Sequence, residues 1–124
     1  MLPQDGRSFV IRLIFAGAAV ATFAAPLWSG ELPSLSQLLG ADATVISTDY
    51  TCDKGGPIQV RYINSSHNNL AIVPVDGVER IFVNVMSGSG ARYVSGQFEW
   101  WTKGNSATLR DEMANTSAEC TSAN

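Results

Sequence analysis

The stretch Ser87–Leu109, SGSGARYVSGQFEWWTKGNSATL, decides how this chain folds. It holds three short runs that contain aromatic and β-branched residues, separated by Gly96 and Gly104. Runs of this length with glycine between them are typical of antiparallel strands joined by tight turns. Ser89, with glycine on both sides, precedes the first run, and Lys103 ends the second. The pattern therefore predicts a rigid hairpin that presents two polar groups at its ends.

The same succession of short strand-like runs and turns extends over most of the chain. Outside Ser87–Leu109, the strand-like runs are TVISTDYTC (44–52), IQVRYIN (58–64), LAIVPV (70–75) and VERIFVNVMSG (78–88). Asp76-Gly77 reads as a tight hairpin turn, and the tail after Asp111 is polar until Cys120. Seven or eight short strands in so few residues favour closure, since a closed barrel has no exposed edges. We expect an all-β fold, a small closed antiparallel barrel of about eight strands.

The N-terminus has the pattern of an export signal. Arg7 precedes an apolar run at 9–23, which is short for a membrane span, and small residues follow it. An uncleaved anchor is the alternative. Because the first cysteine is Cys52, no thiol is available for lipidation near the end of this run. We expect residues 1–30 to be a signal peptide with its cleavage region, 31–43 a tether or short turn of helix, and 44–124 the folded domain of a periplasmic protein that is not a lipoprotein.

Charge and cysteine content limit the possible partners. Residues 31–124 contain 6 basic and 10 acidic residues, a formal charge of −4. Nucleic acid binding needs clustered Lys and Arg, so this balance argues against it and suits a basic partner. The two cysteines, Cys52 and Cys120, predict one structural disulfide in an exported protein. Closing so long a loop stabilises the fold by at most roughly 4.4 kcal/mol.

Two motifs within Ser87–Leu109 resemble those of a known family. SGxxY matches at 89–93, and YxxGxxxFWxKGxxAxL matches from Tyr93 to Leu109, with Trp100 in the place of Phe. These are the signature motifs of the MliC/PliC family, bacterial inhibitors of c-type lysozyme. The resemblance implies an eight-stranded antiparallel barrel. It also implies a periplasmic inhibitor that inserts loops carrying Ser89 and Lys103 into the lysozyme cleft and thereby protects peptidoglycan.

The resemblance implies binding roles for six residues, and the residue types leave alternatives. The predicted lysozyme-binding residues are Ser89, Gly90, Arg92, Tyr93, Lys103 and Gly104. Taken alone, Ser89 is also a common turn serine and Lys103 a common solvated turn lysine. Arg92 either packs over Tyr93 or contacts a partner, and Tyr93 either closes the loop internally or borders the interface. Trp100 and Trp101 must point to opposite faces of their strand, and one of them is therefore the more buried.

Enzymatic and metal-dependent functions find little support. The single histidine, His67, lies far from Ser89 in the sequence, which argues against a Ser-His-Asp hydrolase. A barrel this small lacks the material for a sugar-sized cleft between two carboxyls, as glycoside hydrolysis requires. One histidine and two cysteines that we expect to form a disulfide do not make a metal site, and we expect no cofactor. The remaining alternative is an envelope- or carbohydrate-binding module that stacks sugars on exposed tryptophans.

Overall fold

A computed structural model describes residues 16–23 and 30–123. The predicted signal segment falls largely outside these residues and stays a prediction. The barrel and the short helix before it belong to the unit Leu32–Asn124. That helix, α1 (Leu35–Leu39), is capped at its N-terminus by Ser34, whose hydroxyl accepts a hydrogen bond from the Gln37 amide. No helix among the described residues is long and apolar enough to cross a membrane.

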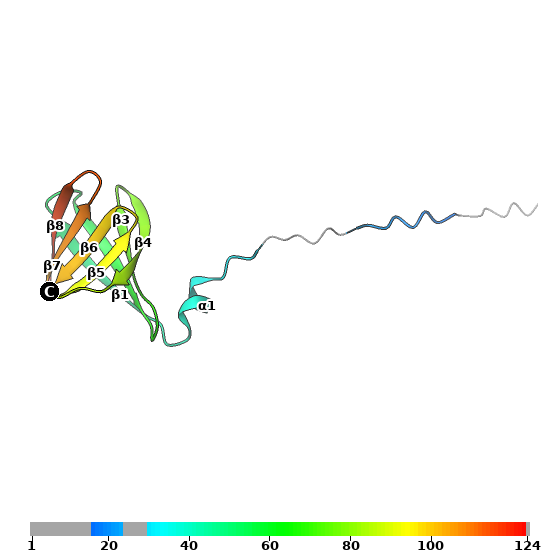
Figure 1. The fold of residues 1–124 in the computed structure, drawn as a ribbon, viewed down its shortest axis with the longest axis horizontal. Coiled ribbons are helices and arrows are strands. Elements are labelled where there is room, and N and C mark those ends of the chain that lie inside the picture. Colours follow the sequence, from blue (N-terminus) through cyan, green and yellow to red (C-terminus); the bar gives the residue numbers. More distant parts are fainter. Residues whose placement is uncertain (1–15, 24–29, 124) are drawn as a thin grey trace, which may run out of the picture. The chain divides into compact units, whose positions relative to one another are not determined.

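Eight antiparallel strands close into a barrel in sequence order, which confirms the predicted fold class (Figure 1). They are β1 (Thr44–Cys52), β2 (Pro57–Asn64), β3 (Asn69–Val75), β4 (Val78–Val85), β5 (Ala91–Ser95), β6 (Phe98–Lys103), β7 (Ser106–Asp111) and β8 (Thr116–Ser122). The predicted turn at Asp76-Gly77 is present, with positive φ at both residues. β8 corrects the sequence analysis, which expected only a polar tail there. Its inward-facing residues are small, so it lacks a hydrophobic strand pattern.

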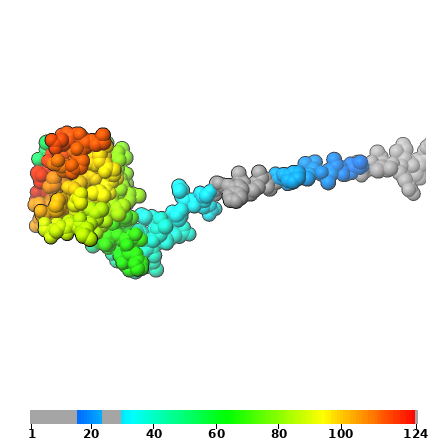
Figure 2. Space-filling view, viewed as in Figure 1, coloured from blue at the N-terminus to red at the C-terminus, as the bar shows by residue number. Residues whose placement is uncertain are grey.

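The connections between strands lie alternately at the two ends of the barrel, because every strand runs antiparallel to the next. One end carries the connections 65–68, 86–90 and 104–105, and we call it the loop end. The other carries 53–56, 76–77, 96–97 and 112–115, and we call it the turn end. At the loop end, the Ser66 amide donates to Asp42, which fixes the 65–68 connection to the segment after α1. In Figure 2 the green part of the barrel adjoins the cyan segment that precedes it.

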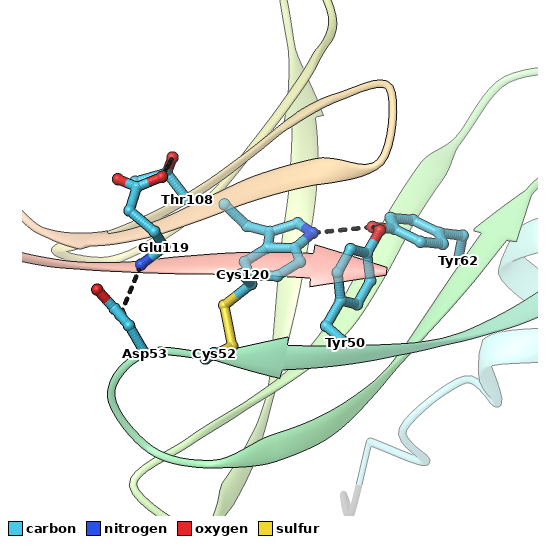
Figure 3. The surroundings of a disulfide bond; sticks show 8 residues. Tyr50, Cys52, Asp53, Tyr62, Thr108, Glu119 and Cys120 are labelled. Atoms are coloured by element: carbon cyan, nitrogen blue, oxygen red, sulfur yellow. Dashed lines mark hydrogen bonds between the residues drawn. A yellow bond between two sulfur atoms is a disulfide. The ribbon is translucent and has the colours of Figure 1, made fainter. Parts of the chain in front are cut away.

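The interior of the barrel is filled around Trp100. Its side chain is fully buried, together with Val60, Val73 and Phe82. The Trp100 indole N–H donates to the Tyr62 hydroxyl at 2.9 Å, and the Tyr62 hydroxyl lies 2.7 Å from that of Tyr50. Figure 3 shows the two phenol groups pointing toward each other beside the disulfide. Burial, followed by the bond with Tyr50, raises the pKa of Tyr62, so the Tyr62 hydroxyl stays neutral at physiological pH.

The disulfide lies at the seam that closes the barrel. Cys52 and Cys120 are register partners in β1 and β8, with their Cα atoms 4.0 Å apart, so the predicted bridge is confirmed. β1 pairs with β8 only through Tyr50–Cys52, whereas its pairing with β2 runs from Thr44 to Thr51. Asp53, directly after Cys52, accepts a hydrogen bond from the Glu119 amide (Figure 3). The covalent bond therefore reinforces the seam where the hydrogen-bond ladder is short.

Candidate functional site

Ser89 and Lys103 lie at the same end of the barrel. Ser89 is in the 86–90 connection between β4 and β5, and Lys103 is the last residue of β6. β5 and β6 are paired neighbours, so the two connections are adjacent at the loop end. Both side chains are exposed. The structure thus brings together the two residues that the sequence singled out.

Gly90 fixes how closely the two connections approach. Its φ is +64°, a conformation that residues with a side chain rarely adopt. A Cβ atom there would overlap the Thr102 carbonyl oxygen and lie 2.8 Å from Cγ of Lys103. Only glycine allows the backbone of the 86–90 connection to rest directly against the end of β6. The glycine after Ser89 is therefore a geometric requirement of the site.

Trp101 contacts both connections from the outer face of β6. Its indole N–H donates to the Ser89 carbonyl oxygen at 2.9 Å. The Lys103 ammonium lies 4.6 Å from the centroid of the Trp101 ring, and the Arg92 guanidinium lies 5.9 Å from it. The 86–90 connection also has an internal bond, from the Ser87 hydroxyl to the Gly90 carbonyl. Its backbone is therefore held at two of its five residues, Ser89 and Gly90.

The functional groups of Ser89 and Lys103 are available to a partner. Among the described residues, none hydrogen-bonds to the Ser89 hydroxyl, and none offers the Lys103 ammonium a carboxylate. The other basic side chains differ. Three arginines form ion pairs, and Lys54 donates to the Ser117 carbonyl. Of the described basic residues, only Lys103 and Arg80 have an aromatic ring as their sole partner.

The other predicted binding residues have different environments. Arg92 and Tyr93 point to opposite faces of β5, so Arg92 does not pack over Tyr93. Arg92 instead forms an ion pair with Glu99, at 2.6 Å. Tyr93 is only 7% exposed, and burial raises the pKa of its phenol, which favours the internal role over contact with a partner. Gly104 has a φ of +57° and begins the two-residue turn after Lys103.

The sequence analysis missed Met86 and Glu99. Met86 begins the 86–90 connection and is 94% exposed, so an apolar side chain stands in solvent beside Ser89. Glu99 carries the charge that holds Arg92. Both line a shallow groove of about 500 Å³ on the outer face of β5 and β6. The sequence held one signal for Met86: it directly precedes the run SGSG. An apolar side chain in a glycine-rich connection has no core to enter and is therefore expected to be exposed.

The adjacent tryptophans, Trp100 and Trp101, lie on opposite faces of β6. Trp100 is fully buried and Trp101 is half-buried on the outer surface. A sugar-stacking surface built from both is thereby ruled out, because Trp100 is not accessible. A second cavity, of about 500 Å³, opens at the turn end between Ile58, Phe98 and Leu109. None of the predicted binding residues lines it.

Fold and site together define a class of protein: a small β-barrel, closed by a disulfide, that exposes the side chains of Ser89 and Lys103 on adjacent connections. Residues 50–118 match the family described as membrane-bound lysozyme-inhibitor of c-type lysozyme. The chain belongs to this family.

Two curated relatives are both named membrane-bound lysozyme inhibitor of C-type lysozyme. The protein from Cupriavidus necator is 50% identical over 64 residues, which are 52% of this chain and 51% of that protein. The protein from Pseudomonas aeruginosa is 52% identical over 64 residues, 51% of this chain and 50% of that protein. The matched region thus spans about half the length of each relative.

A solved structure has the same fold. It is the crystal structure of Pseudomonas aeruginosa MliC in complex with hen egg white lysozyme. It superimposes with a TM-score of 0.60 at 40% sequence identity, covering 73% of this chain and 89% of that one. The similarity therefore extends over most of that relative, which was crystallised with a lysozyme.

Proposed function

We propose that this protein inhibits c-type lysozyme by inserting Ser89 and Lys103 into the substrate cleft of the enzyme. One observation carries the proposal: Ser89 and Lys103 are exposed on adjacent connections at the loop end, and their functional groups have no polar partner within residues 16–23 and 30–123. Family membership and the relative crystallised with hen egg white lysozyme supply the partner. No chemistry on this chain is required, since occupying the cleft is sufficient to exclude the substrate.

The chemistry of the lysozyme cleft suits these two groups. That cleft holds a glutamic acid with a raised pKa, which acts as general acid, and an ionised aspartate. Ser89 would exchange a hydrogen bond with the glutamic acid, since a hydroxyl both donates and accepts. Lys103 would pair with the aspartate as a compact positive charge. Both catalytic groups would then be engaged while the sugar is excluded.

The barrel reduces the entropic cost of binding. Gly90 lies against the end of β6, and Trp101 holds the Ser89 carbonyl, so the connection is ordered before it meets a partner. Ordering a side chain or a loop at an interface otherwise costs about 0.5–1.5 kcal/mol per immobilised side chain. We therefore propose that the loop end acts as a preformed insert whose backbone changes little on binding.

We place this activity in the periplasm, after removal of the first 24 to 30 residues. The apolar run at 9–23 and the disulfide both support export. The two curated relatives carry names that describe membrane-bound proteins. Cell fractionation with N-terminal sequencing of the product tests the location. Intact Met1 in the membrane fraction would contradict it.

The inhibition assay is direct. Purified protein comprising residues 31–124 is added to a c-type lysozyme that is clearing a suspension of bacterial cell walls. We expect inhibition that saturates at one inhibitor per enzyme. A cell-wall hydrolase without the lysozyme fold serves as the control, because inhibition of both enzymes would show that the protein protects the wall itself. Absence of inhibition at micromolar concentrations would refute the proposal.

A further inference from the structure

We propose that Trp101 is the positioning residue of the site, one side chain that orders both the Ser89 connection and the Lys103 ammonium. The inference rests on the proposed function and deepens it, because it names the group that makes the insert rigid. Trp101 is half-buried on the outer face of β6 and reaches both binding residues. It acts through them, without itself entering the lysozyme cleft.

The first contact is the hydrogen bond from the indole N–H to the Ser89 carbonyl, at 2.9 Å. Residues 86–90 form no strand, and their other side-chain bond, from Ser87 to Gly90, lies within the connection itself. Such a local bond shapes the connection but does not attach it to the barrel. The indole bond does attach it, because Trp101 belongs to β6. It fixes the peptide group next to the Ser89 side chain.

The second contact is the one between the Trp101 ring and the Lys103 ammonium, 4.6 Å from the ring centroid. Residues two apart on a strand point to the same face, so the ring and the lysine stem lie side by side. Cation–π attraction at exposed sites is modest, but it restricts a flexible side chain to fewer rotamers. The lysine is thus held near the end of β6.

A third contact supports the ring from the neighbouring strand. Arg92 is the register partner of Trp101 in β5, and its guanidinium lies 5.9 Å from the centroid of the Trp101 ring. Glu99 holds Arg92 in turn, at 2.6 Å, and its side chain is 13% exposed. Glu99 and Arg92 therefore order the ring, and the ring orders Ser89 and Lys103. This gives Arg92 an indirect role in the site.

The test uses Trp101→Phe, which keeps an aromatic ring but removes the N–H, and Trp101→Leu, which removes both. The matched control is Trp100→Phe, which removes the same N–H one residue earlier, where it donates to Tyr62 in the core. In the free protein, nuclear spin relaxation measures the mobility of residues 87–90. The chemical shifts of the Lys103 methylene protons show whether these protons lie close to the ring at position 101. These measurements require no lysozyme.

We expect Trp101→Phe to increase the mobility of residues 87–90 while much of the Lys103 ring-current shift remains. Trp101→Leu should remove both signatures. Trp100→Phe should lower the melting temperature but change neither signature. Unchanged mobility in Trp101→Phe, in a folded protein, would overturn the proposal. These outcomes hold whether or not the protein inhibits lysozyme, so failure of this inference is distinguishable from failure of the proposed function.

Inhibition then provides the second readout. Trp101→Phe should weaken inhibition by about fivefold, the effect of one neutral hydrogen bond. In a Ser89→Ala background the same change should have a smaller effect, because the group that it orders is gone. In a Lys103→Ala background it should keep its full effect. An effect that is equal in all three backgrounds would indicate direct contact with lysozyme and would contradict a positioning role.

Discussion

The two ends of the barrel use their polar side chains in opposite ways. At the turn end, carboxylates are engaged within the fold: Asp53 accepts from the Glu119 amide, and Asp111 accepts from the amides of Met113 and Ala114. At the loop end, the Ser89 hydroxyl and the Lys103 ammonium have no hydrogen-bonding or charged partner among the described residues, while glycine and tryptophan hold the backbone. The difference shows how a small barrel can use polar side chains at one end to hold its own turns. At the other end, it can present two polar side chains to a partner from ordered connections.

The largest effect is expected from Lys103→Ala. Removing a charge that pairs with a buried partner costs about 2–5 kcal/mol of binding, partly because the partner charge is left unpaired. Ser89→Ala should cost less, about 0.5–1.5 kcal/mol. Lys103→Arg should not restore full inhibition, since a planar fork does not replace a point charge. Inhibition constants measured alongside thermal melts test these values.

Lys54→Ala is the matched control for Lys103→Ala, because it removes the same charge at the turn end. It should leave inhibition within about twofold of the wild type, the range of changes outside an interface. Equal losses from the two lysine variants would show that net charge, and not the loop end, determines inhibition.

Removing the disulfide should separate stability from binding. Cys52→Ser combined with Cys120→Ser is expected to lower the free energy of unfolding by about 2–4 kcal/mol, below the loop-entropy limit of roughly 4.4 kcal/mol. Inhibition measured well below the melting temperature should be retained, because the bridge lies at the β1–β8 seam. Chemical denaturation and the cell-wall assay give both quantities. A folded variant without inhibition would contradict the division between the two regions.

At the loop end, Gly90→Ala should weaken inhibition more than an added methyl group at any other position. The positive φ alone costs about 1 kcal/mol, and the overlap with the Thr102 carbonyl forces the connection to move. We expect weaker inhibition together with a modest loss of stability. Gly88→Ala is the control in the same connection, since nothing lies within 4 Å of its added Cβ. Equal inhibition by the two variants would show that the close approach at Gly90 is unimportant.

The smallest effect concerns pH at the turn end. Hydrogen bonds, the one from the Ala114 amide first, hold the pKa of Asp111 below its usual value of 3.8. A lowered pKa means that the carboxylate stabilises the fold above the pKa of the unfolded chain. This contribution is lost as the pH falls through the folded pKa. The protection of the Met113 and Ala114 amides, measured relative to exchange in an unfolded chain at the same pH, should therefore fall below about pH 4.

Residues 87–90 serve as the internal control for this pH series, because no carboxylate in the described part of the chain accepts a hydrogen bond from their amides. Amide exchange followed by NMR between pH 3 and 7 compares the two ends in one sample. Protection at Met113 and Ala114 that does not change over this range would remove the role assigned to Asp111.

The sequence predicted those parts of the fold that leave a regular signal. Short strand-like runs between turns identified the first seven strands, and two cysteines in a chain that we expect to be exported identified the disulfide. β8 was missed because its inward positions include Ala118 and Cys120, whose side chains are too small to mark a hydrophobic face. Propensity and periodicity respond to large apolar side chains, so a strand of small residues that closes a barrel is recognised only from its partners.

The candidate site was predictable as a set of residues but not as an arrangement. The motif selected Ser89 and Lys103, and strand alternation required that Trp100 and Trp101 face opposite ways. It could not say which of them enters the core, because both are equally apolar. The contact of Gly90 with β6 and the Trp101 bond to a carbonyl depend on register between strands, which one sequence does not specify.

The central claim is that the loop end occupies the sugar-binding cleft of c-type lysozyme, and competition tests it most directly. Binding of the protein to lysozyme is measured by calorimetry with increasing N-acetylglucosamine trisaccharide, a substrate fragment that binds in the cleft. If the two exclude each other, the apparent dissociation constant rises in proportion to the trisaccharide concentration above its own dissociation constant. If the protein binds equally well to lysozyme saturated with trisaccharide, insertion of Ser89 and Lys103 into the cleft is contradicted.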